Sequence, residues 1–408
     1  MVVQMLFMTG DVKVQKSVYL DNNATTYMKK EVLDEMLPYL TENFGNPSSK
    51  FYEVGRIAEK ALYSYRQRVA DVLGANVNEI YFTGSGCEAD NWAIKGVADA
   101  YRKRGNHIIT SSIEHHAILG ACEFLEKHGF EVTYLPVDEF GFVNPDDVER
   151  AITDKTVLIS VMTANNEIGT VEPIKEISEI AKKHKIIFHT DAVQAIGHIR
   201  INVKELGVDM LSLSAHKFHG PKGVGVLYIK NGTRISNLIH GGGQERGKRA
   251  ATENLAAIAG LAKAIEIADS ELDKNIYEMS RKRDKLISGV LERIPYTRLN
   301  GPTGENRLCN NANFSFKYIE GESILMLLDM KGIAASSGSA CASGSLDPSH
   351  VLLAIGLPHE IAHGSLRLSV GDDTTDEDID YVLEVLPPII ERLRMMSPLY
   401  EEVLNKKG

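Results

Sequence analysis

Short apolar runs alternate with amphipathic segments from about residue 56 to residue 270 of the chain. Between the runs lie segments with helical spacing, such as RIAEKALYSYRQRVADVL and IKEISEIAKKH. Continuous apolar strands separated by helices are typical of a parallel sheet that is buried on both faces. We therefore expect an α/β fold with a mainly parallel sheet. Its predicted strands are EIYFTG, HIITSS, EVTYLPV, TVLISVM, IIFHTD, MLSLS and GVGVLYI.

The pattern changes near residue 270. One long helix is predicted from about Leu255 through Arg283, and a mixed region follows, with NANFSFKY, ESILMLLDMKG, RLSV and DIDYVLEVLPPIIERLRMM. We expect a large domain over residues 25–270 and a smaller α+β domain made of residues 1–24 and 271–408. Within the small domain, the run of small residues at about 336–348 predicts an exposed and mobile loop.

Composition and charge narrow the class of protein. Hydrophobic residues make up 43% and charged residues 25% of the 408 positions, which is ordinary for a globular enzyme. The formal net charge of −10 argues against a surface that binds nucleic acid. The four cysteines are far apart and show no zinc-like spacing, so we expect no metal site and a reducing, cytoplasmic setting. No apolar run reaches the ~18 residues of a membrane helix, so no membrane association is expected.

Polar and ionisable residues follow the predicted strands at their carboxyl ends, where open α/β sheets bind ligands. Taken singly, each is more often a cap, a turn former or a surface residue. Their concurrence at one edge of the sheet instead predicts a site. The residues in question are Gly86, Cys87, His115, Asn166, Asp191, Gln194, Ser214, His216 and Lys217.

These residue types suit one cofactor, pyridoxal 5′-phosphate (PLP). A glycine-bearing turn at a helix start offers free N–H groups to a phosphate. Lys217 can form an imine, while Asp191 can pair with a pyridinium nitrogen, and His115 can stack on the ring. A Schiff-base lysine with an acidic partner at the ring nitrogen is the protein's part in PLP chemistry.

Several motifs resemble the NifS/IscS-like cysteine desulfurases, which belong to the class-V aminotransferase group of fold-type-I PLP enzymes. The similar segments occur in order over about residues 18–397: YLDNNATT, FGNPSS, ANNEIGT, HTDAVQAIG, SAHKFHGPKGVG, GGGQERGKRAATEN and SSGSACASGSLDPSHVL. The resemblance implies conversion of L-cysteine to L-alanine. The sulfur passes to an enzyme cysteine as a persulfide and then to an acceptor protein, such as an iron–sulfur scaffold.

The resemblance also implies a role for each matching residue. Lys217 is the Schiff-base lysine and moves protons on the substrate, while His115 stacks on the ring and takes part in acid–base steps. Arg367 binds the substrate carboxylate, a task for a planar bidentate donor, with Asn166 beside it. Cys341 takes the sulfur. The remaining cofactor contacts implied are Asp191 at the ring nitrogen, Gln194 and Asn166 at the ring oxygen, Ser214, His216, Gly86 and Cys87 at the phosphate, and Thr252 from the other subunit of a homodimer.

Two positions depart from the family pattern. Cys87 replaces a threonine in the phosphate loop, and a thiol is a weaker hydrogen-bond donor than a hydroxyl. Its place at a helix N-terminus also predicts a lowered thiol pKa and makes Cys87 a minor candidate for reactivity. Asp372 stands where a basic residue is expected, and its sequence context assigns it no consequence.

Two other functions remain open at this point. One is a different PLP reaction on the same fold, namely that of selenocysteine lyase or of another class-V aminotransferase. The other is a sulfur-carrying scaffold that has lost catalysis, against which the intact set of Lys217, Asp191, His115 and Cys341 speaks.

Overall fold

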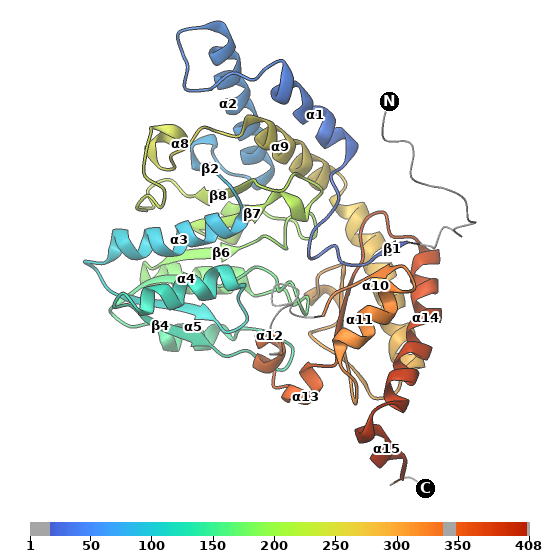
Figure 1. Cartoon of the computed structure of the whole chain (residues 1–408). Helices are drawn as coiled ribbons and strands as arrows, with labels where there is room; N and C mark the ends of the chain where they lie inside the picture. Colours follow the sequence, from blue (N-terminus) through green and yellow to red (C-terminus); the bar gives the residue numbers. More distant parts are fainter. Residues whose placement is uncertain (1–16, 338–347, 406–408) are drawn as a thin grey trace, which may run out of the picture.

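A seven-stranded sheet is the largest element of the computed structural model, which describes residues 17–337 and 348–405 (Figure 1). Its strand order is β2-β8-β7-β6-β5-β3-β4. Neighbouring strands are parallel from β7 to β4, whereas β8 is antiparallel to both β2 and β7. The predicted mainly parallel sheet is confirmed. The strands are β2 (Ile80–Thr83), β3 (His107–Ser111), β4 (Glu131–Leu135), β5 (Thr156–Ser160), β6 (Ile187–Asp191), β7 (Met210–Ser214) and β8 (Gly225–Ile229).

The central strands are buried on both sides because their successive side chains enter two different cores. Ile108 and Leu158 pack with the helices on one face, whereas the next residues, Ile109 and Ile159, pack on the opposite face. The first face is covered by α3 (Gly86–Tyr101) and α4 (His116–Glu126). The other face is covered by α1 (Lys30–Thr41), α2 (Glu53–Leu73), α5 (Pro145–Ala151), α6 (Ile174–His184), α7 (Val203–Leu206) and α9 (Leu255–Ser270).

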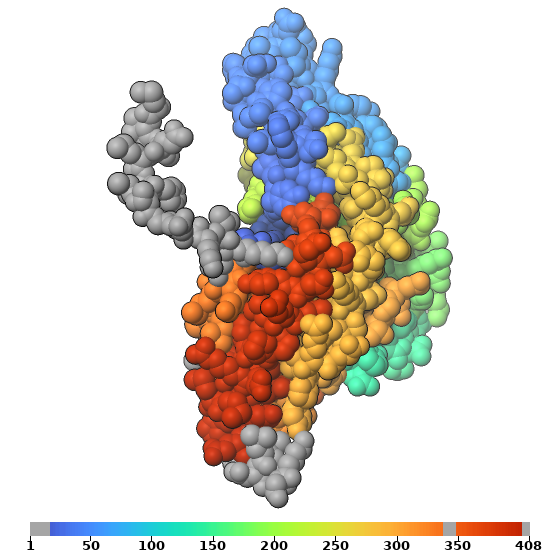
Figure 2. All heavy atoms as spheres, turned by 90° about the vertical axis from the view of Figure 1, so that its right-hand side faces the viewer, coloured from blue at the N-terminus to red at the C-terminus, as the bar shows by residue number. Residues whose placement is uncertain are grey.

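A separate hydrophobic core lies in the C-terminal part of the chain. It is built on a three-stranded antiparallel sheet with the order β12-β10-β9. The N-terminal strand joins this core, because β1 pairs with β11 and buries Val18. The helices α10 and α14 lie side by side on one face of the molecule (Figure 2). The elements are β1 (Val18–Tyr19), β9 (Thr297–Leu299), β10 (Asn311–Phe316), β11 (Ile333–Ala334), β12 (Ser365–Ser369), α10 (Leu272–Arg293), α11 (Gly321–Asp329) and α14 (Asp376–Met395).

The prediction of one long helix from Leu255 through Arg283 is wrong. The segment forms two helices, α9 and α10, with Glu271 between them in a non-helical conformation. The side chains of α9 pack in the core of the large sheet, whereas those of α10 pack in the C-terminal core. One straight helix cannot face both cores, so the chain bends at Glu271.

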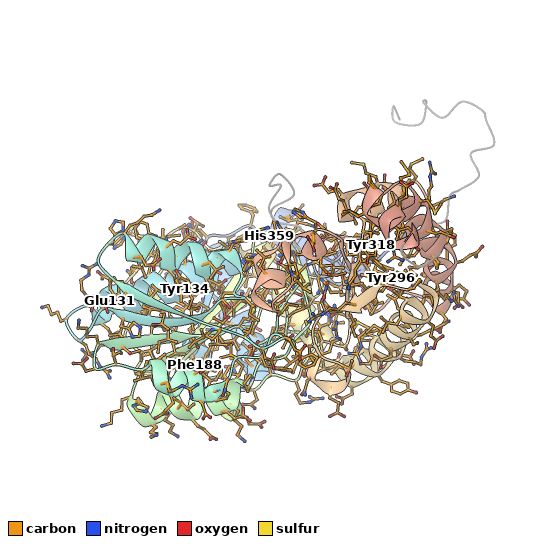
Figure 3. All side chains as sticks on the ribbon, turned by 90° about the horizontal axis from the view of Figure 1, so that it is seen from below. Glu131, Tyr134, Phe188, Tyr296, Tyr318 and His359 are labelled. Carbon is orange, nitrogen blue, oxygen red and sulfur yellow. The ribbon has the colours of Figure 1, made fainter. Side chains whose placement is uncertain are left out.

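Tyrosine rings secure the last helix. Tyr296 and Tyr318 pack edge to face with their ring centroids 5.7 Å apart, and Tyr400 of α15 joins them (Figure 3). Among the helices described, none combines the length and the apolar composition needed to cross a bilayer. The remaining short helices are η1 (Val77–Glu79), η2 (Ala215–Lys217), η3 (Gly304–Asn306), α8 (Gln244–Gly247), α12 (His350–Ala354), α13 (His359–Ala362) and α15 (Pro398–Asn405).

Candidate active site

A cavity of about 560 Å³ lies beyond the carboxyl ends of β3, β5, β6 and β7. The sheet supplies most of its wall, and β12 of the C-terminal core adds Arg367. Ten of the twelve predicted site residues line this one cavity, although they come from distant parts of the chain. They are Gly86, Cys87, His115, Asn166, Asp191, Gln194, Ser214, His216, Lys217 and Arg367.

Lys217 ends the short helix η2, which directly follows strand β7. Its Nζ donates hydrogen bonds to the backbone oxygens of Asn23, at 2.5 Å, and Ala24, at 2.9 Å. The Asn23 oxygen also accepts from Nε2 of Gln194 at 2.9 Å. The N-terminal segment therefore positions the amine. The motif YLDNNATT contains these residues, yet backbone carbonyls carry no signature in the sequence.

Asp191 is the last residue of β6 and is almost fully buried. Its Oδ1 accepts a hydrogen bond from the backbone N–H of Val193 at 2.8 Å. Burial raises the pKa of Asp191 to about 6, while the bond from Val193 and the charge of Lys217 act in the opposite direction. When a cation is placed beside a buried carboxyl of this kind, the cation lowers the pKa of the carboxyl and favours its ionised form.

Helix α3 begins at the cavity wall, with Ser85 as its N-cap. The side chain of Ser85 accepts from the backbone N–H of Glu88, and the N–H groups of Gly86 and Cys87 belong to the first turn, which has no partner within the helix. A Cβ on Gly86 would lie 3.2 Å from Cβ of Ser214 and 2.8 Å from Cγ2 of Val193. Glycine is therefore needed for the helix start to approach the end of β7.

His115 and His216 line the cavity in their neutral form. His115 caps helix α4, and its Nδ1 accepts the backbone N–H of Ala117 at 3.1 Å, which leaves the ring proton on Nε2. Burial lowers the pKa of His115 to about 4, helped by the charge of Lys217. Nδ1 of His216 lies 3.1 Å from Oγ1 of Thr25, and burial lowers the pKa of His216 to about 4.

The prediction of a lowered thiol pKa for Cys87 is wrong. Burial raises the pKa of Cys87, and the nearby carboxyl of Asp90 raises it further. The helix N-terminus alone was the basis for the prediction, whereas desolvation of the thiolate and the charge of Asp90 act in the opposite direction. The thiol therefore remains protonated at neutral pH.

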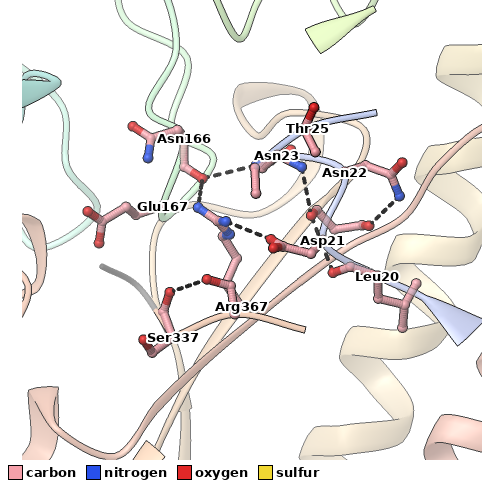
Figure 4. Close-up of polar contacts among 12 residues, drawn as sticks. Leu20, Asp21, Asn22, Asn23, Thr25, Asn166, Glu167, Ser337 and Arg367 are labelled. Atoms are coloured by element: carbon pink, nitrogen blue, oxygen red, sulfur yellow. Dashed lines mark hydrogen bonds and ion pairs between the residues drawn. The ribbon is translucent and has the colours of Figure 1, made fainter. Parts of the chain in front are cut away.

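Arg367 lies in β12 and is almost fully buried; Figure 4 shows its polar contacts. Its Nη2 pairs with Oδ1 of Asp21 at 2.8 Å, and its Nη1 donates to the backbone oxygen of Asn166 at 3.1 Å. Nε has no hydrogen-bond partner among the described residues. The guanidinium is thus held by two contacts and keeps a buried donor for a third group.

Two predicted site residues are not part of this cavity. Thr252 is exposed and does not line it. Cys341 lies outside the described residues.

Among the cavity residues that the sequence analysis missed are three ionisable ones, Asp90, Glu114 and His350. Asp90 comes from the second turn of α3, and His350 from the start of α12. Glu114 accepts from Oγ of Ser111 at 2.7 Å, and burial raises its pKa to about 8. Glu114 directly precedes His115, so the strand-end rule that found His115 also applied to it. Asp90 and His350 had no comparable signal, since neither directly follows a predicted strand.

Asp372 gains an explanation from the structure. It follows β12, and its carboxylate pairs with Nζ of Lys29 at 2.7 Å and with Nε2 of His219 at 3.2 Å. The contacts with His219 and Lys29 outweigh burial and hold the pKa of Asp372 well below its usual range. The acidic residue therefore links the C-terminal core to the segment that carries Lys217.

The cavity suits PLP in both charge and space. The start of α3 offers N–H groups for a phosphate, Lys217 offers an amine for the aldehyde, and Asp191 offers a buried carboxyl for a cationic ring nitrogen. The unpartnered Nε of Arg367 suits a substrate carboxylate. Among the described residues, no group of three or more His, Cys, Asp or Glu side chains is arranged to hold a metal ion.

Known proteins resemble this chain over nearly its full length. The family model described as "Aminotransferase class-V" matches residues 18–382. A protein named "Cysteine desulfurase IscS" from Clostridium botulinum (strain Hall) is 63% identical over 97% of this chain and 99% of its own length. One of the same name from Methanosarcina thermophila is 61% identical over 94% of each chain. A solved structure titled "NIFS-LIKE PROTEIN" has a TM-score of 0.87 and 41% identity, and covers 93% of this chain and 100% of its own.

Proposed function

The chain belongs to the class-V aminotransferase family and is a PLP-dependent cysteine desulfurase of fold type I, and we propose that its reaction takes place in the cavity around Lys217. L-Cysteine is the substrate, and an acceptor protein receives the sulfur. The observation that carries the proposal is the convergence of side chains from four strand ends, Lys217 among them, on one cavity.

In this proposal Lys217 would hold the cofactor covalently, and Asp191 would face its ring nitrogen. When bound, PLP withdraws electrons from the substrate Cα, so that a proton there can be removed. The buried carboxyl of Asp191 would keep the ring nitrogen protonated, because separating that pair in a dry cavity is costly. The other proposed contacts are His115, Asn166 and Gln194 around the ring, and Gly86, Cys87, Ser214 and His216 around the phosphate, with Thr252 from a second subunit.

The chain's own groups would manage the proton and the substrate. The amine of Lys217, held by two backbone oxygens, would take the proton at the substrate Cα. His115 carries its ring proton on Nε2 and would act as an acid at the substrate. Arg367 would bind the substrate carboxylate, with Asn166 beside it, and its contact with Asp21 fixes the plane of the guanidinium.

Cys341 is proposed as the sulfur-accepting nucleophile. Its thiolate would attack the sulfur of the substrate, the carbon–sulfur bond would break, and the carbon would take up a proton to give alanine. The persulfide left on Cys341 would then pass its sulfur to an acceptor, which we propose is an iron–sulfur scaffold. We place this chemistry in the cytoplasm, since the three cysteines among the described residues are free thiols.

A homodimer with composite active sites is also proposed. Thr252 is exposed and away from the cavity of its own chain, and large apolar side chains are exposed around α1 and α2. Phe44 is 72% and Phe51 99% exposed, which is typical of surfaces that a partner covers. The test is subunit exchange between two variants, Lys217→Ala and Thr252→Ala. Activity should return in the mixture, because one site of the heterodimer then carries neither change; a strictly monomeric protein would contradict the proposal.

The reaction itself is tested with purified protein and L-cysteine in the absence of a keto acid. Alanine and reducible sulfur should appear in equal amounts, and free sulfide should require added reductant. Alanine that forms only when a keto acid is supplied would instead indicate an aminotransferase.

A further inference from the structure

The proposed mechanism does not use the buried carboxyl of Asp90, which lies near Asp191 in the cavity wall. Asp90 of α3 is 1% exposed and lines the cavity. Its carboxyl shares a hydrogen bond with Ser212, and its Oδ1 has no hydrogen-bond partner among the described residues. Leaving a buried carboxylate oxygen unpaired is costly, so this position favours a neutral acid.

Asp90 ends a buried chain of polar groups that reaches across three strands. Oγ of Ser212 lies 2.9 Å from Nε2 of His189, and Nδ1 of His189 lies 2.9 Å from Oγ of Ser160. Ser212 pairs directly with Asp191 in the register of β6 and β7, and His189 lies two residues before Asp191 on the same side of β6. This series of polar side chains therefore supports the end of β6, which carries Asp191.

Among the described residues, the groups that act most strongly on Asp90 include no cation. His189 is 3.8 Å from Oδ1 of Asp90, but burial lowers the pKa of His189 to about 3, so the ring is neutral and forms no ion pair. The other ionisable groups that act on Asp90 are the carboxyls of Asp191 and Glu114, and the thiol of Cys87 shares its helix. Burial raises the pKa of Asp90 well above its usual value, helped by the charge of Asp191 and opposed by the hydrogen bond with Ser212.

We propose that Asp90 is a positioning residue that keeps its proton in the working enzyme, which leaves Asp191 as the anion facing the ring nitrogen of the cofactor. This inference rests on the proposed cofactor site. The proton lies on the oxygen facing Ser212, because the other oxygen has no acceptor. Asp90 then donates to Ser212, Ser212 donates to Nε2 of His189, and Nδ1–H of His189 donates to Ser160. An ionised Asp90 would reverse every one of these bonds and move the histidine proton to Nε2.

The tautomer of His189 is therefore the direct readout. In holoenzyme carrying ¹⁵N-labelled histidine, NMR should show His189 protonated at Nδ1 and bare at Nε2 across neutral pH. A His189 protonated at Nε2 would overturn the proposal, and this measurement needs no variant that must fold.

Two substitutions separate the neutral carboxyl from an anion. Asp90→Asn keeps a donor toward Ser212, so it should retain the His189 tautomer and hold the dissociation constant of PLP within about twofold of wild type. Asp90→Ala removes the donor, and should mix the two tautomers and weaken PLP binding about tenfold, which corresponds to ~1.4 kcal/mol. Weak binding in Asp90→Asn would show an ionised Asp90, and wild-type behaviour of Asp90→Ala would show that Asp90 positions nothing.

Asp191→Asn is the matched control for the site itself. It removes a negative charge from the neighbouring carboxyl and should weaken PLP binding and shift the visible absorption of the bound cofactor. If Asp191→Asn has no such effect, the proposed cofactor site fails. If Asp191→Asn has the effect but the His189 tautomer is the reverse, only the inference about Asp90 fails.

Discussion

Carboxyl groups are buried in two regions of this protein, with opposite electrostatic surroundings. In the wall of the cavity, Asp191 and Glu114 are buried with little positive charge around them, and burial raises their pKa values to about 6 and about 8. At the seam between the two cores, formed by Lys29, His219 and Asp372, the ion pairs hold the pKa of Asp372 well below its usual range. The cavity wall therefore binds protons more tightly than an exposed carboxyl does, whereas the seam favours the ionised carboxylate.

Removing Lys217 should have the largest effect, since it takes away a cavity amine whose charge acts on Asp191. Lys217→Ala should lower the rate of alanine formation from L-cysteine by at least about three orders of magnitude, or ~4 kcal/mol. Borohydride treatment of wild type should attach the cofactor to the peptide containing Lys217.

Lys222→Ala is the matched control, because Lys222 also lines the cavity but is exposed. It should keep most of the activity. Two results would contradict the assignment of Lys217: attachment of the cofactor to Lys222, or an inactive Lys222→Ala together with an active Lys217→Ala.

At the seam, Asp372→Asn should reduce stability and leave cofactor attachment intact. Losing charge-assisted bonds to Lys29 and His219 should cost about 2 kcal/mol at pH 7, seen as a lower thermal midpoint. A carboxyl with a lowered folded pKa stabilises above its unfolded pKa of ~3.9 and loses this contribution as pH falls, so the two proteins should converge in acid. Asp373→Asn, at the exposed neighbour, should have little effect; equal loss in both variants would remove the special role of Asp372.

The cavity wall should show the opposite pH dependence, with a smaller effect. The folded protein binds the proton of Glu114 more tightly than the unfolded chain, so stability from this group falls as pH rises from about 4.5 to about 8. In cofactor-free protein, Glu114→Gln should remove part of this fall and raise the thermal midpoint at pH 8 relative to wild type. Equal slopes of midpoint against pH in the two proteins would contradict a proton held on Glu114.

The sequence predicted the cavity wall far better than the seam. Lys217, Asp191 and His115 follow apolar strands, and the geometry of a parallel sheet brings such residues together whatever their separation in the chain. The contact of Asp372 with Lys29 depends on how two separate cores pack, and no local pattern encodes that. The break at Glu271 was also missed, because both flanking segments have good helical spacing. The bend there depends on how the two cores pack.

The sequence also did not predict the pKa of Cys87 or the backbone contacts of Lys217. Cys87 lies at a helix start as predicted, yet its pKa is raised by partial desolvation of the thiol and by the nearby carboxyl of Asp90. The hydrogen bonds from Lys217 to Asn23 and Ala24 involve backbone oxygens, which every residue has. Residue types therefore do not predict which backbone oxygens accept these hydrogen bonds.

The most direct test of desulfurase chemistry in this cavity is the reaction of L-cysteine with wild type and Cys341→Ser, followed by measurement of alanine and of peptide mass. Cys341→Ser should bind PLP normally and change its spectrum on adding cysteine, because the cofactor is held by the strand ends, yet it should release almost no alanine. Wild type without reductant should gain the mass of one sulfur on the peptide containing Cys341. Full alanine production by Cys341→Ser, or the added sulfur on Cys87, would contradict the account.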